Sequence, residues 1–224
     1  MKNIELAVWD YDGVIVDSFK DVHASYERLC NELGGKYYKD INEFKKHYNI
    51  PENHIKFLEN LGISNDKHAR ADEIFNGEMA KKEPLLFEGV EETLRTVYNK
   101  RDMVIVSSGH RPEIINRLVD MEILHIFMDI FANRLNGVYF DKTEPIKTAI
   151  ERYAKLGDNA IMIGDRNVDF FHAREAGIPA ENIVLTDYGW GYNREKLQEQ
   201  GYCLNTRVKK PLDILTAIEE IESK

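Results

Sequence analysis

The stretch AVWDYDGVIVDS, residues 7–18, begins with an apolar run and passes directly into acidic residues, Asp10, Asp12 and Asp17. A short apolar run of this kind is typical of a strand that is buried on both faces of a sheet. Similar runs follow along the chain, and each ends at or close to a small or acidic residue: 103–108, 126–132, 159–165 and 181–187. The ends of these strands are therefore expected to carry polar side chains.

Helical patterns separate the apolar runs. Apolar residues recur at spacings near three and four in the segments 112–122, 144–156 and 169–177. Alternating strands and helices are the pattern of a parallel sheet that is covered on both faces. The sequence therefore predicts an α/β fold with a doubly wound parallel sheet.

Residues 17–82 break this alternation. They are rich in Lys, Glu, Asn and His, and they show helical periodicity without a convincing strand. The clearest helices are expected at 18–33 and at 51–62, where Pro51 stands at a helix start and Gly62 lies just past the end. We expect a helical cap domain, residues 17–82, inserted into a core domain formed by residues 1–16 and 83–224.

Composition and charge exclude several classes of function. The 224 residues contain 30 Lys and Arg against 39 Asp and Glu, a net charge of −9, so binding to nucleic acid or to an anionic membrane is not expected. Neither an apolar run of membrane-spanning length nor the apolar core of a signal peptide is found, and Cys30 and Cys203 lack metal or disulfide spacing. These features predict a cytoplasmic protein and leave its oligomeric state open.

Acidic residues gather where the predicted strands end. Asp10 and Asp12 follow the first strand, while Asp165 and Asp169 lie four residues apart at a strand-to-helix turn. Ligands of doubly wound sheets bind at the carboxyl ends of the strands. Carboxylates 4 Å apart there would repel by roughly 4 kcal/mol per pair at an effective dielectric near 20. A bound divalent cation would relieve this repulsion, and oxygen ligands without His or Cys favour Mg²⁺ over zinc.

Four segments together resemble the sequence motifs of the haloacid dehalogenase (HAD) superfamily. They occur in the family's order and with similar spacing: DYDGVIVDS at 10–18, VIVSSG at 104–109, DKTEPI at 141–146 and GDRNVD at 164–169. The resemblance covers nearly all of the predicted core. It implies a Rossmann-like core domain and places the helical insert among the small caps of the phosphoglycolate phosphatase and phosphomutase branch, which close over small soluble substrates.

The resemblance also implies a role for each motif residue. Asp10 would be the nucleophile that forms an aspartyl-phosphate, and Asp12 would protonate the leaving oxygen and later activate water. Ser107, with the backbone amides of Ser108 and Gly109, would hold the phosphoryl oxygens, and Lys142 would neutralise charge. The implied ligands of Mg²⁺ are the Asp10 carboxylate, the Asp12 carbonyl oxygen, Asp165, and Asp169 directly or through a neighbour.

The presence of Asp12 narrows the expected reaction. Dehalogenases and phosphonate-cleaving members of the superfamily lack this second aspartate, so its presence favours a phosphatase, a phosphoric monoester hydrolase acting on a small phosphorylated metabolite. A phosphomutase that uses the same aspartate is the alternative. A signalling receiver module or an inactive binding protein is a further alternative, although a receiver is about half this length and carries its acid pair and its phospho-accepting aspartate on separate strands.

Several motif positions have a competing interpretation. Taken alone, Asp10 and Asp12 could form a solvated turn, and Ser107 and Ser108 could cap a helix; Ser107 fits the family position better than Ser108. Lys142 is favoured over Lys147 because it directly precedes the segment TEPI. Four other residues are kept out of the catalytic set, His110 as a solvated loop residue and three aromatic residues as packing residues: Tyr188, Trp190 and Tyr192.

Overall fold

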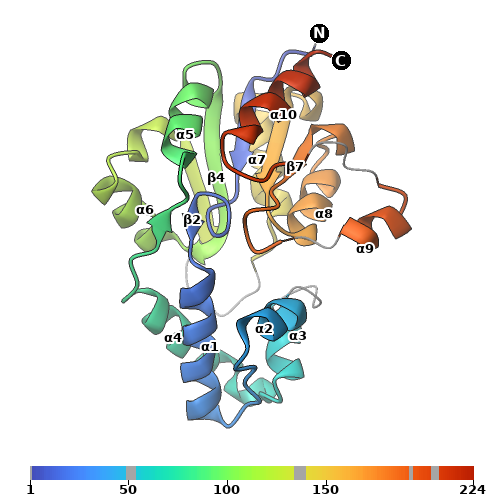
Figure 1. Ribbon diagram of the computed structural model, residues 1–224. Coiled ribbons are helices and arrows are strands. Elements are labelled where there is room, and N and C mark those ends of the chain that lie inside the picture. Colours follow the sequence, from blue (N-terminus) through green and yellow to red (C-terminus); the bar gives the residue numbers. More distant parts are fainter. Residues whose placement is uncertain (1, 49–53, 134–139, 192–193, 203–206) are drawn as a thin grey trace. The chain divides into compact units, whose positions relative to one another are not determined.

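Parallel strands form the central sheet of the protein. The computed structural model describes residues 2–48, 54–133, 140–191, 194–202 and 207–224. Within them, the sheet has five strands in the order β5-β4-β1-β6-β7 (Figure 1). The strands are β1 (Leu6–Trp9), β4 (Asp102–His110), β5 (Asp129–Asn133), β6 (Ala160–Gly164) and β7 (Ile183–Leu185). The chain adds β4 and β5 on one side of β1 and then crosses to β6 and β7 on the other, so the strand order reverses beside β1.

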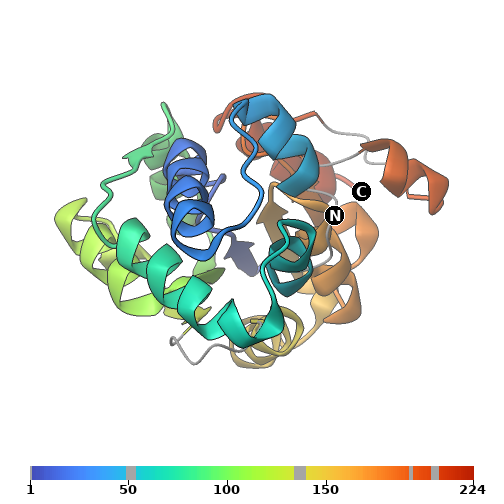
Figure 2. The same cartoon turned by 90° about the horizontal axis from the view of Figure 1, so that it is seen from below.

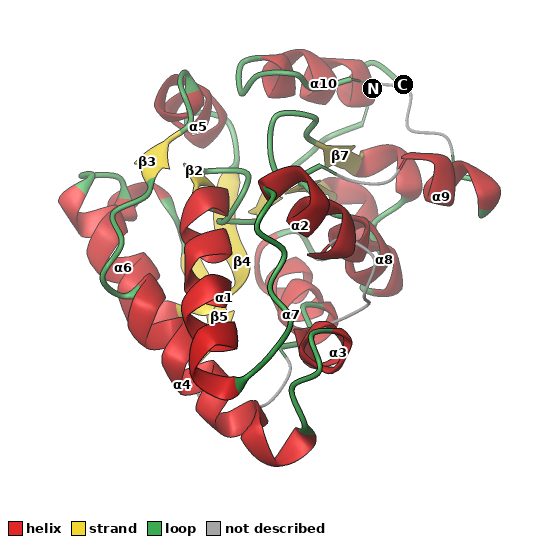
Figure 3. Cartoon of the chain, turned by 60° about the horizontal axis from the view of Figure 1, so that its bottom comes forward, coloured by secondary structure: helices red, strands yellow, loops and turns green. Residues whose placement is uncertain are grey.

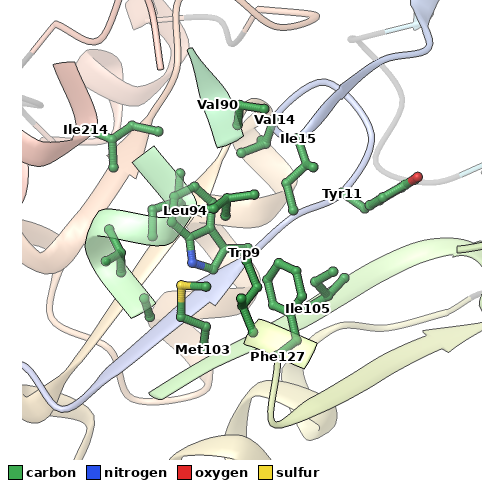
Figure 4. Packing of buried hydrophobic residues seen from close by; sticks show 14 of the residues in the cluster. Trp9, Tyr11, Val14, Ile15, Val90, Leu94, Met103, Ile105, Phe127 and Ile214 are labelled. Carbon is green, nitrogen blue, oxygen red and sulfur yellow. The ribbon is translucent and has the colours of Figure 1, made fainter. Parts of the chain in front are cut away.

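Helices cover both faces of this sheet. Leu6 and Val8 pack on one face, whereas Ala7 and Trp9 pack on the other, because successive side chains of a strand point in opposite directions. Helices α7 (Thr143–Tyr153), α8 (Asn167–Glu175) and α9 (Arg194–Glu199) contribute to the first core. The second core includes side chains of α5 (Val90–Tyr98), α6 (Arg111–Asp120) and α10 (Asp213–Glu222), and Figure 4 shows Trp9 packed with Leu94 and Met103.

The doubly wound parallel sheet that the sequence predicts is confirmed, but two strands are shorter than expected. In the apolar run 126–132, a 3₁₀ turn (Leu124–Ile126) precedes the strand, which starts at Asp129. In the run 181–187, a 3₁₀ turn (Ala180–Asn182) precedes a strand of three residues. Ile126 and Phe127 are buried although they are not in a strand. An apolar run therefore indicates that the chain is buried, but it does not distinguish a buried strand from a buried tight turn.

A second compact unit contains the described residues between 18 and 85. Its helices are α1 (Phe19–Leu33), α2 (Ile41–Tyr48), α3 (His54–Asn60) and α4 (His68–Met79), with a 3₁₀ turn at Asn65–Lys67 (Figure 3). Helices α1 and α4 lie side by side (Figure 2). In the core of this unit, the centroid of the Tyr26 ring lies 5.0 Å from that of Phe57 and 5.5 Å from that of Phe44. Pro51, the expected start of the helix at 51–62, lies outside the described residues.

The chain leaves and re-enters the unit that contains the parallel sheet through two short strands. These strands, β2 (Val16–Asp17) and β3 (Leu85–Leu86), form a two-stranded sheet that the sequence patterns did not predict. The unit with the parallel sheet comprises the described parts of 1–17, 86–134 and 140–224. Its two ends meet where the Lys2 N–H donates to the Glu222 carbonyl oxygen. Among the described helices, none has the length and apolar character that a membrane crossing requires.

Candidate active site

Three buried carboxylates converge at the carboxyl end of the sheet. Asp10 follows β1, Asp165 follows β6, and Asp169 lies in the first turn of α8. One oxygen from each lies within 4.8 Å of the others. Because β1 and β6 are parallel neighbours, and the Asp10 N–H donates to the Ile163 carbonyl oxygen, the two strands end side by side. The cluster therefore lies where the strand order reverses, which is the usual ligand position in this type of sheet.

The Lys142 ammonium lies between two of these carboxylates. This residue immediately precedes α7, and its Nζ is 2.8 Å from Asp10 Oδ2 and 2.7 Å from Asp169 Oδ1. Its side chain is only 5% exposed. Burial alone would lower the pKa of Lys142, but the charges of Asp10 and Asp169 outweigh burial and raise it. Lys142 therefore stays positively charged and offsets part of the repulsion in the cluster.

Asp169 is tied to its surroundings through both oxygens. Oδ1 accepts from Lys142, while Oδ2 accepts from the backbone N–H groups of Asp165 and Arg166, at 3.2 and 3.1 Å. Burial acts to raise the pKa of Asp169, yet the charge and hydrogen bond of Lys142 lower it below its ordinary value. The ionised Asp169 thus holds both Lys142 and the turn that carries Asp165.

Asp165 differs because one of its oxygens has no hydrogen-bond partner within the described ranges. The Trp190 N–H donates to Oδ2 at 2.6 Å, whereas Oδ1 is buried without a hydrogen-bond partner among the described residues. Burial, together with the charges of Asp169 and Asp10, raises the pKa of Asp165 well above its ordinary value. A buried carboxylate oxygen without a partner is costly unless a ligand satisfies it. This oxygen, with its acidic neighbours, fits a divalent cation with a preference for oxygen ligands.

The Asp10 carboxylate is held in one orientation. Its Oδ1 accepts from the Tyr11 N–H at 2.7 Å, and its Oδ2 contacts the Lys142 ammonium. Burial raises the pKa of Asp10 to about 7, although the charge of Lys142 opposes this shift. A cation bound beside Asp10 would favour its ionised form.

Asp12 lies beside the carboxyl-terminal part of β4. Its Oδ2 and the Ser107 Oγ lie 3.1 and 3.2 Å from the point that a Cβ atom on Gly109 would occupy. Ser107 is buried, and the side chain of Ser108 is exposed. The Gly109 N–H donates to Ser107 Oγ at 3.0 Å, so this amide would have to exchange its partner before it could bind a phosphoryl oxygen.

Sequence comparison identifies the protein family of this chain. Residues 7–183 match the haloacid dehalogenase-like hydrolase family. The chain belongs to this family. No curated protein matches the chain.

Solved structures share the complete fold of this haloacid dehalogenase-like hydrolase. A predicted phosphatase from Clostridium acetobutylicum has a TM-score of 0.82 and 22% identity, with 97% of this chain and 99% of that chain covered. A haloacid dehalogenase-like family hydrolase from Streptococcus pneumoniae has a TM-score of 0.77 and 24% identity, with 96% and 98% covered. A protein from Thermotoga maritima assigned as a β-phosphoglucomutase has a TM-score of 0.64 and 20% identity, with 97% and 99% covered. At these identities the likeness establishes the fold.

The structure brings together most of the residues that the motifs single out in this haloacid dehalogenase-like hydrolase. Asp10, Asp165, Asp169 and Lys142 form one contact network, and Asp12 lies beside Ser107 and Gly109. Lys147, the competing lysine, pairs with Glu144 on the surface, where its side chain is 41% exposed. His110 lies next to Glu113, with 3.0 Å between Nδ1 and Oε1.

Sequence reasoning missed the contribution of the segment after β7. Trp190 is buried, as a packing residue would be, but its backbone N–H also holds Asp165. Gly189 lies against Asp165 as well. The glycines on both sides of Trp190 are the only local signal for such close packing, and they do not reveal which residue is packed. Tyr192, the third aromatic residue of this stretch, lies outside the described residues.

Proposed function

We propose that this protein is a Mg²⁺-dependent phosphatase that hydrolyses a small phosphorylated metabolite through an aspartyl-phosphate on Asp10. The observation that supports it most is the arrangement around Asp10: a buried carboxylate bound to a buried lysine, in a cluster with Asp165, one oxygen of which lacks a hydrogen-bond partner within the part of the chain that the structure describes. Membership of the haloacid dehalogenase-like hydrolase family is consistent with this chemistry.

The residues present suit a magnesium ion. Asp10, Asp165 and the carbonyl oxygen of Asp12 would hold it, with Asp169 beside them, and all of these are oxygen ligands. When bound, Mg²⁺ supplies positive charge that draws electron density from the phosphoryl oxygens and lowers the repulsion between phosphate and the acidic cluster.

In the first step, an Asp10 carboxylate oxygen attacks the phosphorus of the substrate. A bond forms between Asp10 and phosphorus, and the bond from phosphorus to the ester oxygen breaks. Asp12 donates its proton to the departing oxygen, so the product leaves as an alcohol. The Lys142 ammonium, already 2.8 Å from Asp10 Oδ2, offsets the negative charge brought in by the phosphoryl group.

In the second step, water replaces Asp10 on phosphorus. Asp12, now ionised, removes a proton from the water as the oxygen attacks, and the bond between phosphorus and Asp10 breaks to release inorganic phosphate. Ser107 and the backbone amides of Ser108 and Gly109 hold the phosphoryl oxygens during both displacements. The same carboxyl group thus serves as acid and then as base, which returns the site to its starting protonation state.

Measurement of phosphate release tests this function. The purified protein should hydrolyse p-nitrophenyl phosphate in the presence of Mg²⁺, and EDTA should suppress the reaction. Asp10→Asn should abolish hydrolysis because an amide oxygen is a poor nucleophile. Asp120→Asn, on an exposed residue at the end of α6, is the matched control and should retain full activity. Retained activity in Asp10→Asn would exclude Asp10 as the nucleophile.

A phosphomutase is the second candidate, because it would use the same aspartate but return the phosphoryl group to a bound sugar. The Thermotoga maritima structure with this fold bears that assignment. Incubation of a hexose monophosphate with a trace of its bisphosphate separates the two activities. Formation of an isomeric monophosphate faster than free phosphate would favour the mutase, whereas phosphate release without isomer supports the phosphatase.

A further inference from the structure

The Asp165 carboxylate occupies a narrow slot between two glycines that are far apart in the sequence. A Cβ atom on Gly13, which has a φ angle of +81°, would lie 2.7 Å from Asp165 Cγ. A Cβ atom on Gly189 would lie 2.7 Å from Asp165 Cβ and 2.8 Å from its Oδ2. All three distances are shorter than a van der Waals contact to carbon. Any larger residue at 13 or 189 would therefore displace Asp165 or the loop.

Trp190, the residue after Gly189, holds the Asp165 carboxylate in one orientation. The Trp190 backbone N–H donates to Asp165 Oδ2 at 2.6 Å, at the short end of the distances found for N–H···O hydrogen bonds. With Oδ2 bound in this way, Oδ1 is the oxygen that is buried without a hydrogen-bond partner among the described residues. Gly189 and Trp190 thus determine which Asp165 oxygen is left to bind a ligand.

We propose that the segment Gly189–Trp190 is a positioning element for the metal ligand Asp165, acting through the Trp190 backbone N–H and the absence of a side chain at 189. The inference rests on the proposed function, because it assumes that Asp165 binds Mg²⁺. Groups that orient a metal ligand typically change metal affinity by 10- to 100-fold when they are removed. The segment should therefore control the affinity for the metal from a loop that contributes no ligand of its own.

The test is direct metal binding to the whole protein. Mn²⁺ stands in for Mg²⁺, and free Mn²⁺ is counted by electron paramagnetic resonance, so the readout does not depend on turnover. Gly189→Ala should weaken Mn²⁺ binding by about 10- to 100-fold. The Mg²⁺ concentration that gives half-maximal phosphate release should rise by a similar factor, while the rate at saturating Mg²⁺ changes less.

Gly157→Ala is the matched control for a steric clash. A Cβ atom on Gly157 would lie 2.7 Å from the Gly177 carbonyl carbon, an overlap similar to that at Gly189. Gly157 lies in the 3₁₀ turn before β6, at the strand end opposite to Asp165. This variant should lose stability like Gly189→Ala but bind Mn²⁺ with unchanged affinity.

Two changes at Trp190 separate the backbone from the side chain. Trp190→Phe keeps the N–H donor and should leave Mn²⁺ affinity within about twofold of the original, well inside the loss expected when an orienting group is removed. Replacing Trp190 by its α-hydroxy acid, indole-3-lactic acid, puts an ester in place of the peptide bond and removes only the N–H. This replacement should weaken Mn²⁺ binding by about tenfold or more. It also serves if Gly189→Ala does not fold, because it adds no volume.

The outcomes distinguish this inference from the proposed function. Unchanged Mn²⁺ affinity in both Gly189→Ala and the ester variant would overturn the positioning role, while metal binding and Asp10-dependent phosphate release by the original protein would leave the phosphatase proposal standing. An equal loss in Trp190→Phe would assign the effect to the indole and contradict the role of the N–H. Absence of Mn²⁺ binding by the original protein would overturn both.

Discussion

Replacing Lys142 by methionine should destabilise the metal-free protein by about 3–5 kcal/mol, the usual cost of removing one partner from a buried ion pair. The ammonium contacts Asp10 and Asp169 at 2.8 and 2.7 Å, and neither carboxylate is more than 7% exposed. Methionine fills a similar volume, and the Lys142 carbonyl oxygen still accepts from the Ile146 N–H. The loss would therefore come from charge and not from packing or from the start of α7.

The size of this loss should depend on pH. Burial raises the pKa of Asp10 to about 7, and removal of Lys142 would raise it further. An acid whose pKa is raised by folding loses stabilisation as pH rises from its unfolded pKa through its folded pKa. The loss of stability in the variant should therefore be smaller at about pH 6 than at about pH 8.5, by about 1.2 kcal/mol if the pKa of Asp10 rises by one further unit.

Urea unfolding in EDTA, followed by circular dichroism at the two pH values, measures both effects. Lys147→Met is the matched control because this lysine lies in α7, which Lys142 immediately precedes, and pairs with Glu144 at the surface. Lys147→Met should change the free energy of unfolding by no more than about 0.5 kcal/mol at either pH. A loss below about 1 kcal/mol for Lys142→Met, or equal losses for both lysines, would refute the account of the buried charge network.

Three further predictions concern catalysis, proton linkage and the cysteine. Asp12→Asn should slow p-nitrophenyl phosphate hydrolysis by about 10²- to 10⁴-fold but leave Mn²⁺ affinity nearly unchanged, because the carbonyl oxygen and not the carboxylate is the proposed ligand; a large loss of affinity would contradict this division. Mg²⁺ affinity, measured by calorimetry, should fall as pH drops below about 7, because burial raises the pKa of Asp10 to about 7 and binding must displace its proton; a flat profile would refute the linkage. In a Cys203→Ser background, Cys30 should react with a thiol reagent at least about 100-fold more slowly in the folded than in the urea-unfolded protein, because burial raises its pKa to about 11; equal rates would show an accessible thiolate.

Much of the fold follows from local sequence patterns. The strand at Leu6–Trp9 and the helix at Thr143–Tyr153 are visible because burial on two faces gives an unbroken apolar run, and burial on one face gives a period near 3.6. The motifs also point to the acids at strand ends, and parallel pairing of β1 with β6 then requires Asp10 and Asp165 to be neighbours. The catalytic roles assigned to these residues remain predictions.

Features that depend on tertiary packing could not be predicted. Asp165 and Trp190 are 25 positions apart, and no local sequence pattern predicts the hydrogen bond between them. It forms because β7 pairs with β6, which brings the segment after β7 to the end of β6. Asp165 Oδ1, which has no hydrogen-bond partner in the described parts of the chain, likewise owes this to the folded loop and not to the motif GDRNVD. In the second unit, the packing of Tyr26 against Phe57 depends on how the helices meet, which periodicity alone does not specify.

Crystallisation with Mg²⁺ and beryllium fluoride, a mimic of an aspartate-bound phosphoryl group, tests the proposed chemistry most directly. Beryllium should be bonded to an Asp10 carboxylate oxygen, with a magnesium ion contacting Asp10 and the free oxygen of Asp165, and Lys142 Nζ close to a fluoride. A site that stays empty under these conditions, or fluoride bound away from Asp10, would contradict the account.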